Sequence, residues 1–315
     1  MNRREFMVAG AALALPLPAT AAAPAPTAWT PAQFHAARRF VDLPAGRIAY
    51  VERGSGPVAL FLHGYPLNGF QWRGPMASLA AHRRCIAPDL MGLGYSEIPT
   101  GTSLSPLAQT QMILAFMDRL GIAEADIVAN DSASGIAQLI AAAHPGRVRS
   151  MLLTNGDADT HSPPPLLMPF IELCRSGAAD AWFERHYRDR AWARTDDALG
   201  NTFHDADRAF SDETIEVYFA PLVSNPVRRV QARGYAIDML PNPLPAITPQ
   251  LRTFSRPVRM VWARNLDLFP EALAVWLDGI FPVSRGIRLV DNAKLFFPEE
   301  QPDLIVEEAR SLWGV

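Results

Sequence analysis

One segment of the sequence has the composition of a turn that presents a nucleophile. Residues 126–130 read as a buried strand and residues 132–138 as the start of a helix, with small residues between them. In a strained strand-to-helix turn, small residues must flank the nucleophile, because the helix packs close to the strand. Asp131 stands at the centre of this turn. We therefore interpret the Asp131 carboxylate as the nucleophile.

Ser132 is the alternative nucleophile, but the spacing of small residues favours Asp131. With Asp131 central, the positions two before and two and three after are all small: Ala129, Ala133 and Ser134. With Ser132 central, Asn130 would occupy a position that requires glycine or alanine. A third interpretation also stays open, in which Asp131 only hydrogen-bonds the turn of a protein without catalytic activity.

Length and charge set limits on the function class. The 315 residues are enough to bury a large core, and 49% of them are hydrophobic. The formal net charge is −3, and no run of basic residues indicates a nucleic-acid partner. We expect a small-molecule substrate, and the sequence does not indicate an oligomeric state.

The N-terminal residues resemble an export signal. Arg3 and Arg4 precede Phe6, an apolar run over 8–17 and small residues at 19–23. Paired arginines of this kind are typical of twin-arginine signals, which direct folded proteins to the bacterial periplasm. An ordinary signal peptide or a membrane anchor is the alternative, although the apolar run is short for a spanning helix. We expect residues 1–31 to be signal and tether, and the protein to be periplasmic.

Strands and helices alternate along most of the remaining chain. Strands are expected at 47–52, 57–62, 84–89, 148–154, 258–262 and 287–290, and helices at 107–120, 271–280 and 304–312. Such alternation predicts an α/β fold with a mostly parallel sheet covered by helices on both faces. Residues 156–255 are instead helical in pattern and rich in Phe, Trp and Arg. We therefore expect a core of 32–155 and 256–315 with an inserted helical cap, 156–255.

Four motifs, in order and spacing, resemble the α/β-hydrolase superfamily. They are His63-Gly64-Tyr65-Pro66, Asp89-x-x-Gly92-x-Gly94-x-Ser96, the turn around Asp131, and Pro298-Glu299-Glu300-Gln301-Pro302. An aspartate at the turn is similar to the haloalkane dehalogenase and epoxide hydrolase branch rather than to the serine esterases. The resemblance implies the same α/β fold, with a helical cap inserted into the sheet domain.

The chemistry that the resemblance implies runs through an ester. The aspartate attacks carbon, and a histidine held by a second carboxylate then activates water to hydrolyse the alkyl-enzyme ester. Backbone N–H groups stabilise the oxyanion, and here they would belong to Tyr65 and Ser132. His63 is expected to shape the oxyanion loop, with a direct acid–base role as the alternative.

The expected base histidine is missing. Counting back from Pro302 by the family's interval reaches Leu295, and no histidine follows His204. A carboxylate nucleophile without a base is expected to trap its ester instead of turning it over. His161, which follows the strand over 148–154, is a candidate for a relocated base, and the alternative is that it caps a cap helix.

The acid also departs from the family pattern. Aligning Trp262 and Pro270 with the familiar motif puts Leu266 at the acid position, and Asp267 is one residue later. The acid can instead come after the earlier strand, where Asn155 is followed by Asp157 and Asp159. Asp267 and Asp157 are both retained as candidates.

The expected substrate is a small, mostly apolar electrophile, bound between sheet and cap beside aromatics such as Phe170 or Trp182. Epoxide or ester is favoured over haloalkane, because Ser132 stands where dehalogenases usually have a halide-binding tryptophan. Three cap tyrosines could protonate an epoxide oxygen: Tyr187, Tyr218 and Tyr235. No motif indicates a metal, nucleotide or flavin. The alternatives are a catalytically impaired protein that binds a small apolar ligand, and a lyase or isomerase that uses Asp131 as a general base.

Overall fold

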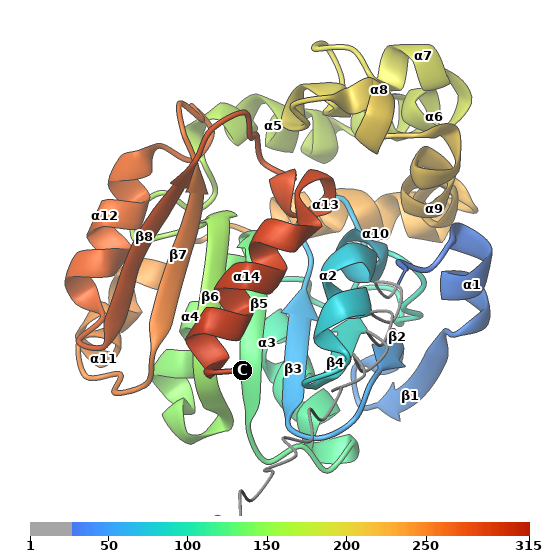
Figure 1. The fold of residues 1–315 in the computed structure, drawn as a ribbon. Helices are drawn as coiled ribbons and strands as arrows, with labels where there is room; N and C mark the ends of the chain where they lie inside the picture. Colours follow the sequence, from blue (N-terminus) through green and yellow to red (C-terminus); the bar gives the residue numbers. More distant parts are fainter. Residues whose placement is uncertain (1–26) are drawn as a thin grey trace, which may run out of the picture.

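The computed structural model describes residues 27–315 (Figure 1). The predicted export signal therefore lies outside the described residues, apart from the last residues of the expected tether. Within that tether, Thr30 already belongs to the folded part, because its side chain caps helix α1 (Pro31–Ala36). Of the helices in this described part, none combines the length and the apolar character needed to cross a membrane.

The sheet has eight strands in the order β1-β2-β4-β3-β5-β6-β7-β8. The strands are β1 (Arg39–Leu43), β2 (Gly46–Arg53), β3 (Val58–Leu62), β4 (Arg84–Pro88), β5 (Ala125–Asp131), β6 (Val148–Gly156), β7 (Val258–Ala263) and β8 (Ser284–Val290). Pairing is antiparallel for β1 with β2 and for β2 with β4, and parallel elsewhere. The predicted fold class is confirmed, and β1 is a strand that the sequence reasoning missed.

Helices cover both faces of the sheet (Figure 1). Helices α2 (Arg73–Leu79) and α14 (Pro302–Trp313) pack together on one face, while α3 (Pro106–Arg119) and α4 (Ser132–Ala143) pack together on the other. Helix α12 (Glu271–Ile280) packs against β7 and β8. Every residue of β5 is consequently buried, as expected for a parallel strand with both faces covered.

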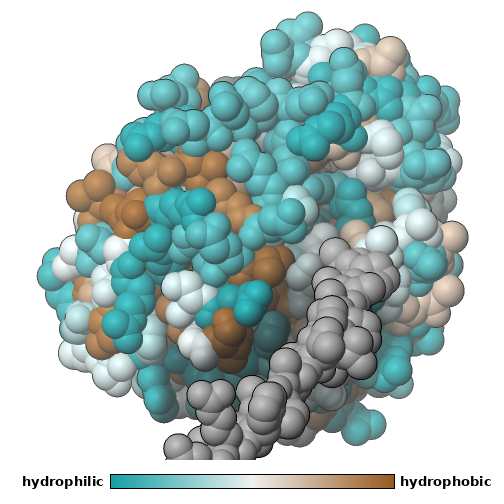
Figure 2. All heavy atoms as spheres, in the orientation of Figure 1, coloured by the Kyte–Doolittle hydropathy of each residue, from teal (hydrophilic) through white to brown (hydrophobic). Residues whose placement is uncertain are grey.

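All regular elements between β6 and β7 are helical. Helices α5 to α10 lie across the edge where the parallel strands end, and the cap surface seen in Figure 2 is mostly hydrophilic. Their bounds are α5 (Met168–Ser176), α6 (Ala179–Arg188), α7 (Arg190–Ala193), α8 (Ala206–Ala209), α9 (Asp212–Val223) and α10 (Pro226–Ile237). The next helix, α11 (Thr248–Leu251), packs against α4, so the chain has returned to the sheet domain before residue 255.

Asp126, near the start of β5, joins this strand by side-chain hydrogen bonds to β6 and to the segment before β4. Its side chain is 1% exposed and accepts hydrogen bonds from Arg83 Nε (2.9 Å), Arg149 Nη1 (2.8 Å) and Ser150 Oγ (2.7 Å). Two guanidinium groups thus neutralise one buried carboxylate. Removing the carboxylate would leave both of them without their shared partner.

We predict that Asp126→Ala lowers the free energy of unfolding by about 3 kcal/mol or more, because breaking a buried ion pair leaves an uncompensated charge. Asp118→Ala is the matched control, since Asp118 pairs with Arg147 at 2.8 Å but is 68% exposed. That variant is expected to lose less than about 1 kcal/mol. Urea unfolding of both variants checks this, and equal losses would contradict it.

Candidate active site

Asp131 ends β5 in a strained backbone conformation. Its φ is 58° and its ψ is −133°, and its side chain makes no cap hydrogen bond to α4, although it is the residue before that helix. A non-glycine residue at positive φ costs free energy and persists only where its surroundings enforce it. The side chain is thereby turned away from the helix and toward the loop after β3.

Two glycines make room for this turn. A Cβ on Gly156 would lie 2.4 Å from the Asp131 carbonyl oxygen, and a Cβ on Gly64 would lie 2.8 Å from the Asp131 Cβ. Both distances are too short for any larger residue. The glycines therefore bring the loop after β3 and the end of β6 against the elbow.

The two expected oxyanion donors lie at the Asp131 carboxylate. The Tyr65 N–H donates to Asp131 Oδ2 at 2.7 Å, and the N–H of Ser132, the next residue in the chain, lowers the pKa of the carboxyl. Backbone donors placed in this way stabilise negative charge without reorganisation during a reaction. The structure thus brings Tyr65, Ser132 and Asp131 together, as the sequence motifs predict.

Burial dominates the electrostatics of this carboxylate. It raises the pKa of Asp131 to about 7, against the two backbone N–H groups, which lower it. Asp157, just beyond β6, is also buried, and its N–H lies 3.3 Å from the Asp131 carbonyl oxygen. Burial, and secondly the charge of Asp131, raise the pKa of Asp157 well above its ordinary value, while a hydrogen bond from Ser162 lowers it.

Leu295, the position at which the sequence motif predicts a base, lines the same cavity as Asp131. Its carbonyl oxygen accepts from Asn130 Nδ2 at 3.2 Å and from Asn155 Nδ2 at 3.3 Å. Gln71 completes this network, because its Nε2 donates to Asn130 Oδ1 and its Oε1 accepts from the Gly64 N–H. Sequence reasoning missed these amides, although an asparagine inside a buried strand is a signal for such a network.

His63 has a structural role in this arrangement. Its Nε2 accepts from the Leu90 N–H at 2.9 Å, so the proton belongs on Nδ1, which donates to the Gly64 carbonyl oxygen at 3.0 Å. Burial lowers the pKa of His63 and keeps the ring neutral. The ring therefore fixes the loop that presents the Tyr65 N–H, and both of its nitrogens are occupied.

The structure does not bring the other candidate base and acid to Asp131. His161 Nε2 lies 2.8 Å from the Leu268 carbonyl oxygen, and the ring packs near Phe269. Asp267 is exposed on the loop after β7. Neither residue lines the cavity beside Asp131, so the geometry gives no support to His161 as base or Asp267 as acid.

Among the three candidate cap tyrosines, Tyr235 lies at the elbow. Its ring stacks on Tyr65 at 5.3 Å between centroids, and its hydroxyl lies 3.0 Å from Ser132 Oγ. The Tyr218 hydroxyl donates instead to Glu299, and the Tyr187 hydroxyl to Glu216. Tyr235 is thus the cap tyrosine that contacts the nucleophile turn.

An apolar cavity opens beside Asp131. Its volume is about 370 Å³, and the sheet domain and the cap both contribute to its walls. Most lining residues are apolar: Pro66, Pro164, Leu166, Leu167, Phe170, Trp182, Ala198, Leu199, Met239, Leu268 and Leu295. Across residues 27–315, no three His, Cys, Asp or Glu side chains are grouped to hold a metal ion. The cavity suits a small apolar molecule.

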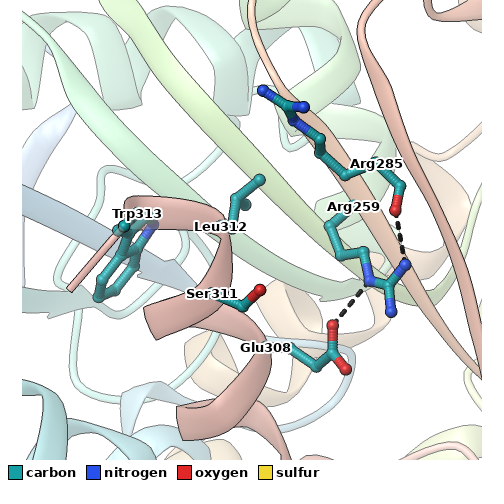
Figure 3. A pocket seen from close by; sticks show the side chains of 7 residues that line it. Arg259, Arg285, Glu308, Ser311, Leu312 and Trp313 are labelled. Atoms are coloured by element: carbon teal, nitrogen blue, oxygen red, sulfur yellow. Dashed lines mark hydrogen bonds and ion pairs between the residues drawn. The ribbon is translucent and has the colours of Figure 1, made fainter.

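A second hollow, of about 600 Å³, lies at the other end of the sheet, between the start of β7 and the end of α14 (Figure 3). There Arg259 Nε donates to Glu308 Oε2 at 2.7 Å, and Arg259 Nη1 donates to the Arg285 carbonyl oxygen. These groups satisfy one another, and the hydroxyl of Ser311, which also lines the hollow, makes no hydrogen bond to a base within residues 27–315. The cavity at Asp131 is therefore the candidate active site.

Comparison with known proteins identifies the family. Residues 57–300 match the family model for the alpha/beta hydrolase fold, and the chain belongs to this family. It is 34% identical over 125 residues to haloalkane dehalogenase 2 from Mycobacterium tuberculosis, a match that covers 40% of this chain and 44% of that protein. It is 37% identical over 154 residues to an epoxide hydrolase from Caballeronia sordidicola, with 45% and 44% covered. The chain thus spans less than half the length of these curated relatives.

Solved structures show the same fold over a larger part of the chain. The epoxide hydrolase CorEH superposes with a TM-score of 0.70 at 21% identity, over 88% of this chain and 98% of its own. A haloalkane dehalogenase from Bradyrhizobium elkani superposes with a TM-score of 0.72 at 23% identity, over 88% and 97%. The sequence and fold matches together place the protein among the relatives of haloalkane dehalogenases and epoxide hydrolases.

The raised pKa of Asp131 predicts a pH-dependent stability difference. An aspartate ionises near pH 3.8 in the unfolded chain but at about 7 here, so ionisation favours unfolding between these values. Asp131→Asn removes this penalty. Its unfolding free energy should rise relative to the unchanged protein between pH 4 and 7 and then level off, at up to about 4 kcal/mol. Urea unfolding at pH 4, 6 and 8 measures this, with Asp118→Asn as an exposed control. A difference that does not vary with pH would contradict the assignment.

Proposed function

We propose that the protein hydrolyses a small, mostly apolar electrophile through an ester formed on Asp131. One observation carries the proposal: a buried carboxylate at the elbow accepts the Tyr65 N–H at 2.7 Å and borders an apolar cavity. Epoxide or ester is favoured over haloalkane. The residue after the nucleophile is Ser132, whose hydroxyl is paired with Tyr235, so the indole N–H that holds halide in dehalogenases has no counterpart at this position.

The first step would be a displacement at carbon. Because Tyr65 holds Oδ2, the other carboxylate oxygen of Asp131 attacks an epoxide carbon, and the carbon–oxygen bond of the ring breaks. The ring oxygen takes a proton from water and becomes a hydroxyl group. Only ionised Asp131 can attack, so ester formation should increase as the pH rises through about 7.

Release of the ester would be the slow step. Leu295 supplies a hydrocarbon side chain where the family has its base, and loss of a general base typically costs about 10²–10⁴-fold in rate. The same residue favours one alternative, a protein that keeps the pocket and binds a small apolar ligand without reaction. Incubation with a reactive compound distinguishes the hydrolase from the binding protein, because a protein that only binds forms no covalent adduct.

The proposed location of this activity is the bacterial periplasm. Support comes from the sequence, in which Arg3, Arg4 and Phe6 precede a short apolar run and small residues. A protein exported in the folded state would arrive with its elbow already formed.

The direct test is the intact mass of the protein after incubation with a panel of epoxides, activated esters and alkyl halides. We expect one adduct per chain, located on the peptide that contains Asp131, with uptake rising toward pH 8. Asp131→Asn should take up none, because the amide is a poor nucleophile. Asp118→Asn should behave as the unchanged protein. If neither adduct nor product appears with any compound, the binding function is favoured instead.

Leu295→His is predicted to speed ester release by at least about tenfold, because it returns a proton acceptor to the position beside Asp131. Leu268→His is the matched control, since Leu268 lines the same cavity without the hydrogen bonds from Asn130 and Asn155. The measurement is the decay of adduct mass after excess reagent is removed. Equal decay in the two variants would contradict a specific role for position 295.

A further inference from the structure

The apolar cavity beside Asp131 carries charges of one sign. Two carboxylates line it, those of Asp131 and Asp197, and its lining within residues 27–315 includes no lysine, arginine or histidine. Asp131 is 8% exposed, whereas Asp197 is exposed at the surface of the cap. The cavity therefore extends from the buried nucleophile to an exposed end at which a second carboxylate lies.

The carboxylate of Asp197 has no partner in the described part of the chain, in which its side chain makes neither an ion pair nor a hydrogen bond. The lysine of this region, Lys294, is engaged elsewhere: its Nζ donates to Asn201 Oδ1 at 3.2 Å and lies 3.7 Å from Asp196 Oδ1. Asp196 does not line the cavity. Of the two neighbouring aspartates, the one that lines the cavity is thus the one without a cation.

The cap segment that begins at Asp197 is held in place from two sides. The Leu199 N–H donates to Nε2 of the buried His186 at 2.9 Å, which ties the segment to α6. The Phe296 N–H donates to the Thr202 carbonyl oxygen at 3.1 Å, which ties it to the residues after β8. The backbone beside Asp197 is thus positioned before any ligand binds.

Aromatic rings contribute a further part of the same lining. Phe170 lies between two others in contact order, with its ring centroid 4.8 Å from that of Trp182 and 6.3 Å from that of Tyr65. All three residues line the cavity. The face of an aromatic ring attracts a cation, most strongly for tryptophan, and alkylated ammonium groups are typical ligands of such rings. The aromatic rings and the carboxylates of this cavity therefore favour ligands of the same charge.

We propose that the preferred substrate is an electrophile with an apolar body and an ammonium group at one end, which Asp197 binds while the electrophilic carbon lies at Asp131. The inference rests on the function proposed above and names a substrate class for the same cavity. Asp197 is in this account a residue that determines specificity. A substrate with an anionic end is disfavoured, because both carboxylates repel it.

The size of the effect follows from the exposure of Asp197. An ion pair at an exposed carboxylate changes an affinity by a modest factor, about two- to fivefold. Added salt screens such a pair, so the preference for the ammonium group should decrease as the ionic strength rises. Contacts between the apolar body and the cavity walls do not share this dependence on salt.

The test compares pairs of epoxides that differ only at one end. Each pair shares an alkyl chain that ends in trimethylammonium or in the neutral, isosteric tert-butyl group, and the chain length varies between pairs. The rate of adduct formation on the full chain is followed by intact mass at pH 8, where Asp131 is ionised. For at least one chain length, the ratio of cationic to neutral uptake should fall at least about twofold from the unchanged protein to Asp197→Asn. Intrinsic differences in reactivity between the two epoxides cancel in this comparison.

Asp207→Asn is the matched control, because Asp207 is an exposed carboxylate on α8 of the cap that does not line the cavity. It should keep the uptake ratio of the unchanged protein. Adducts that form with the same ratio in Asp197→Asn and the unchanged protein at every chain length would overturn the role of Asp197 and leave the proposed function intact. An equal fall in both variants would also overturn it, because the charge of the whole cap would then be the cause. If no epoxide forms an adduct with the unchanged protein, the proposed function fails, and this inference fails with it.

Discussion

The active site depends on a single constraint, the left-handed backbone at Asp131. With φ at 58° at the end of a fully buried strand, the carboxylate turns away from α4 and meets the Tyr65 N–H. Gly64 and Gly156 permit this conformation by letting two neighbouring segments approach the turn. The strain is sustained because β5 lies between β3 and β6 and is hydrogen-bonded to both. The sheet thus enforces the geometry that the chemistry needs.

A buried amide network connects the separate parts of the site. Asn130 reaches the Leu295 carbonyl oxygen on one side and Gln71 on the other, and Gln71 in turn holds the Gly64 N–H. Asn155 also holds Leu295 and accepts the Ala263 N–H of β7. The loop that carries Gly64 and Tyr65, the turn at Asp131 and the backbone at Leu295 are therefore fixed relative to one another. The scaffold for a base is present, although the residue at its position is a leucine.

The sequence predicted the parts of the site that local patterns specify. Small residues around Asp131 predicted the strand-to-helix turn, and the motif at His63 predicted that the Tyr65 N–H lies at the Asp131 carboxylate, because both patterns are imposed by backbone geometry. The parallel sheet followed from the alternation of strands and helices. Strand β1 was not predicted, because it is a short edge strand in which only Val41 is buried.

Features that depend on the direction of a side chain, or on contacts between residues far apart in the chain, could not be predicted from the sequence pattern. His161 and Asp157 are near neighbours in one loop, yet the first turns to the Leu268 carbonyl oxygen and the second packs behind the elbow. Tyr235 could not be chosen from three cap tyrosines, because its stacking on Tyr65 joins residues far apart in the chain. Such contacts depend on how the cap packs on the sheet domain, and no local periodicity encodes them.

The most direct test of a covalent path through Asp131 uses water labelled with the heavy stable isotope of oxygen. After several turnovers in this water, the peptide that contains Asp131 is analysed by mass spectrometry. Our account predicts heavy oxygen in the Asp131 carboxylate, because the oxygen of the attacking water bonds to Cγ of the ester and stays in the carboxylate when the alcohol leaves. Heavy oxygen found in the product, with none in Asp131, would show that water attacks the substrate directly and would contradict the account.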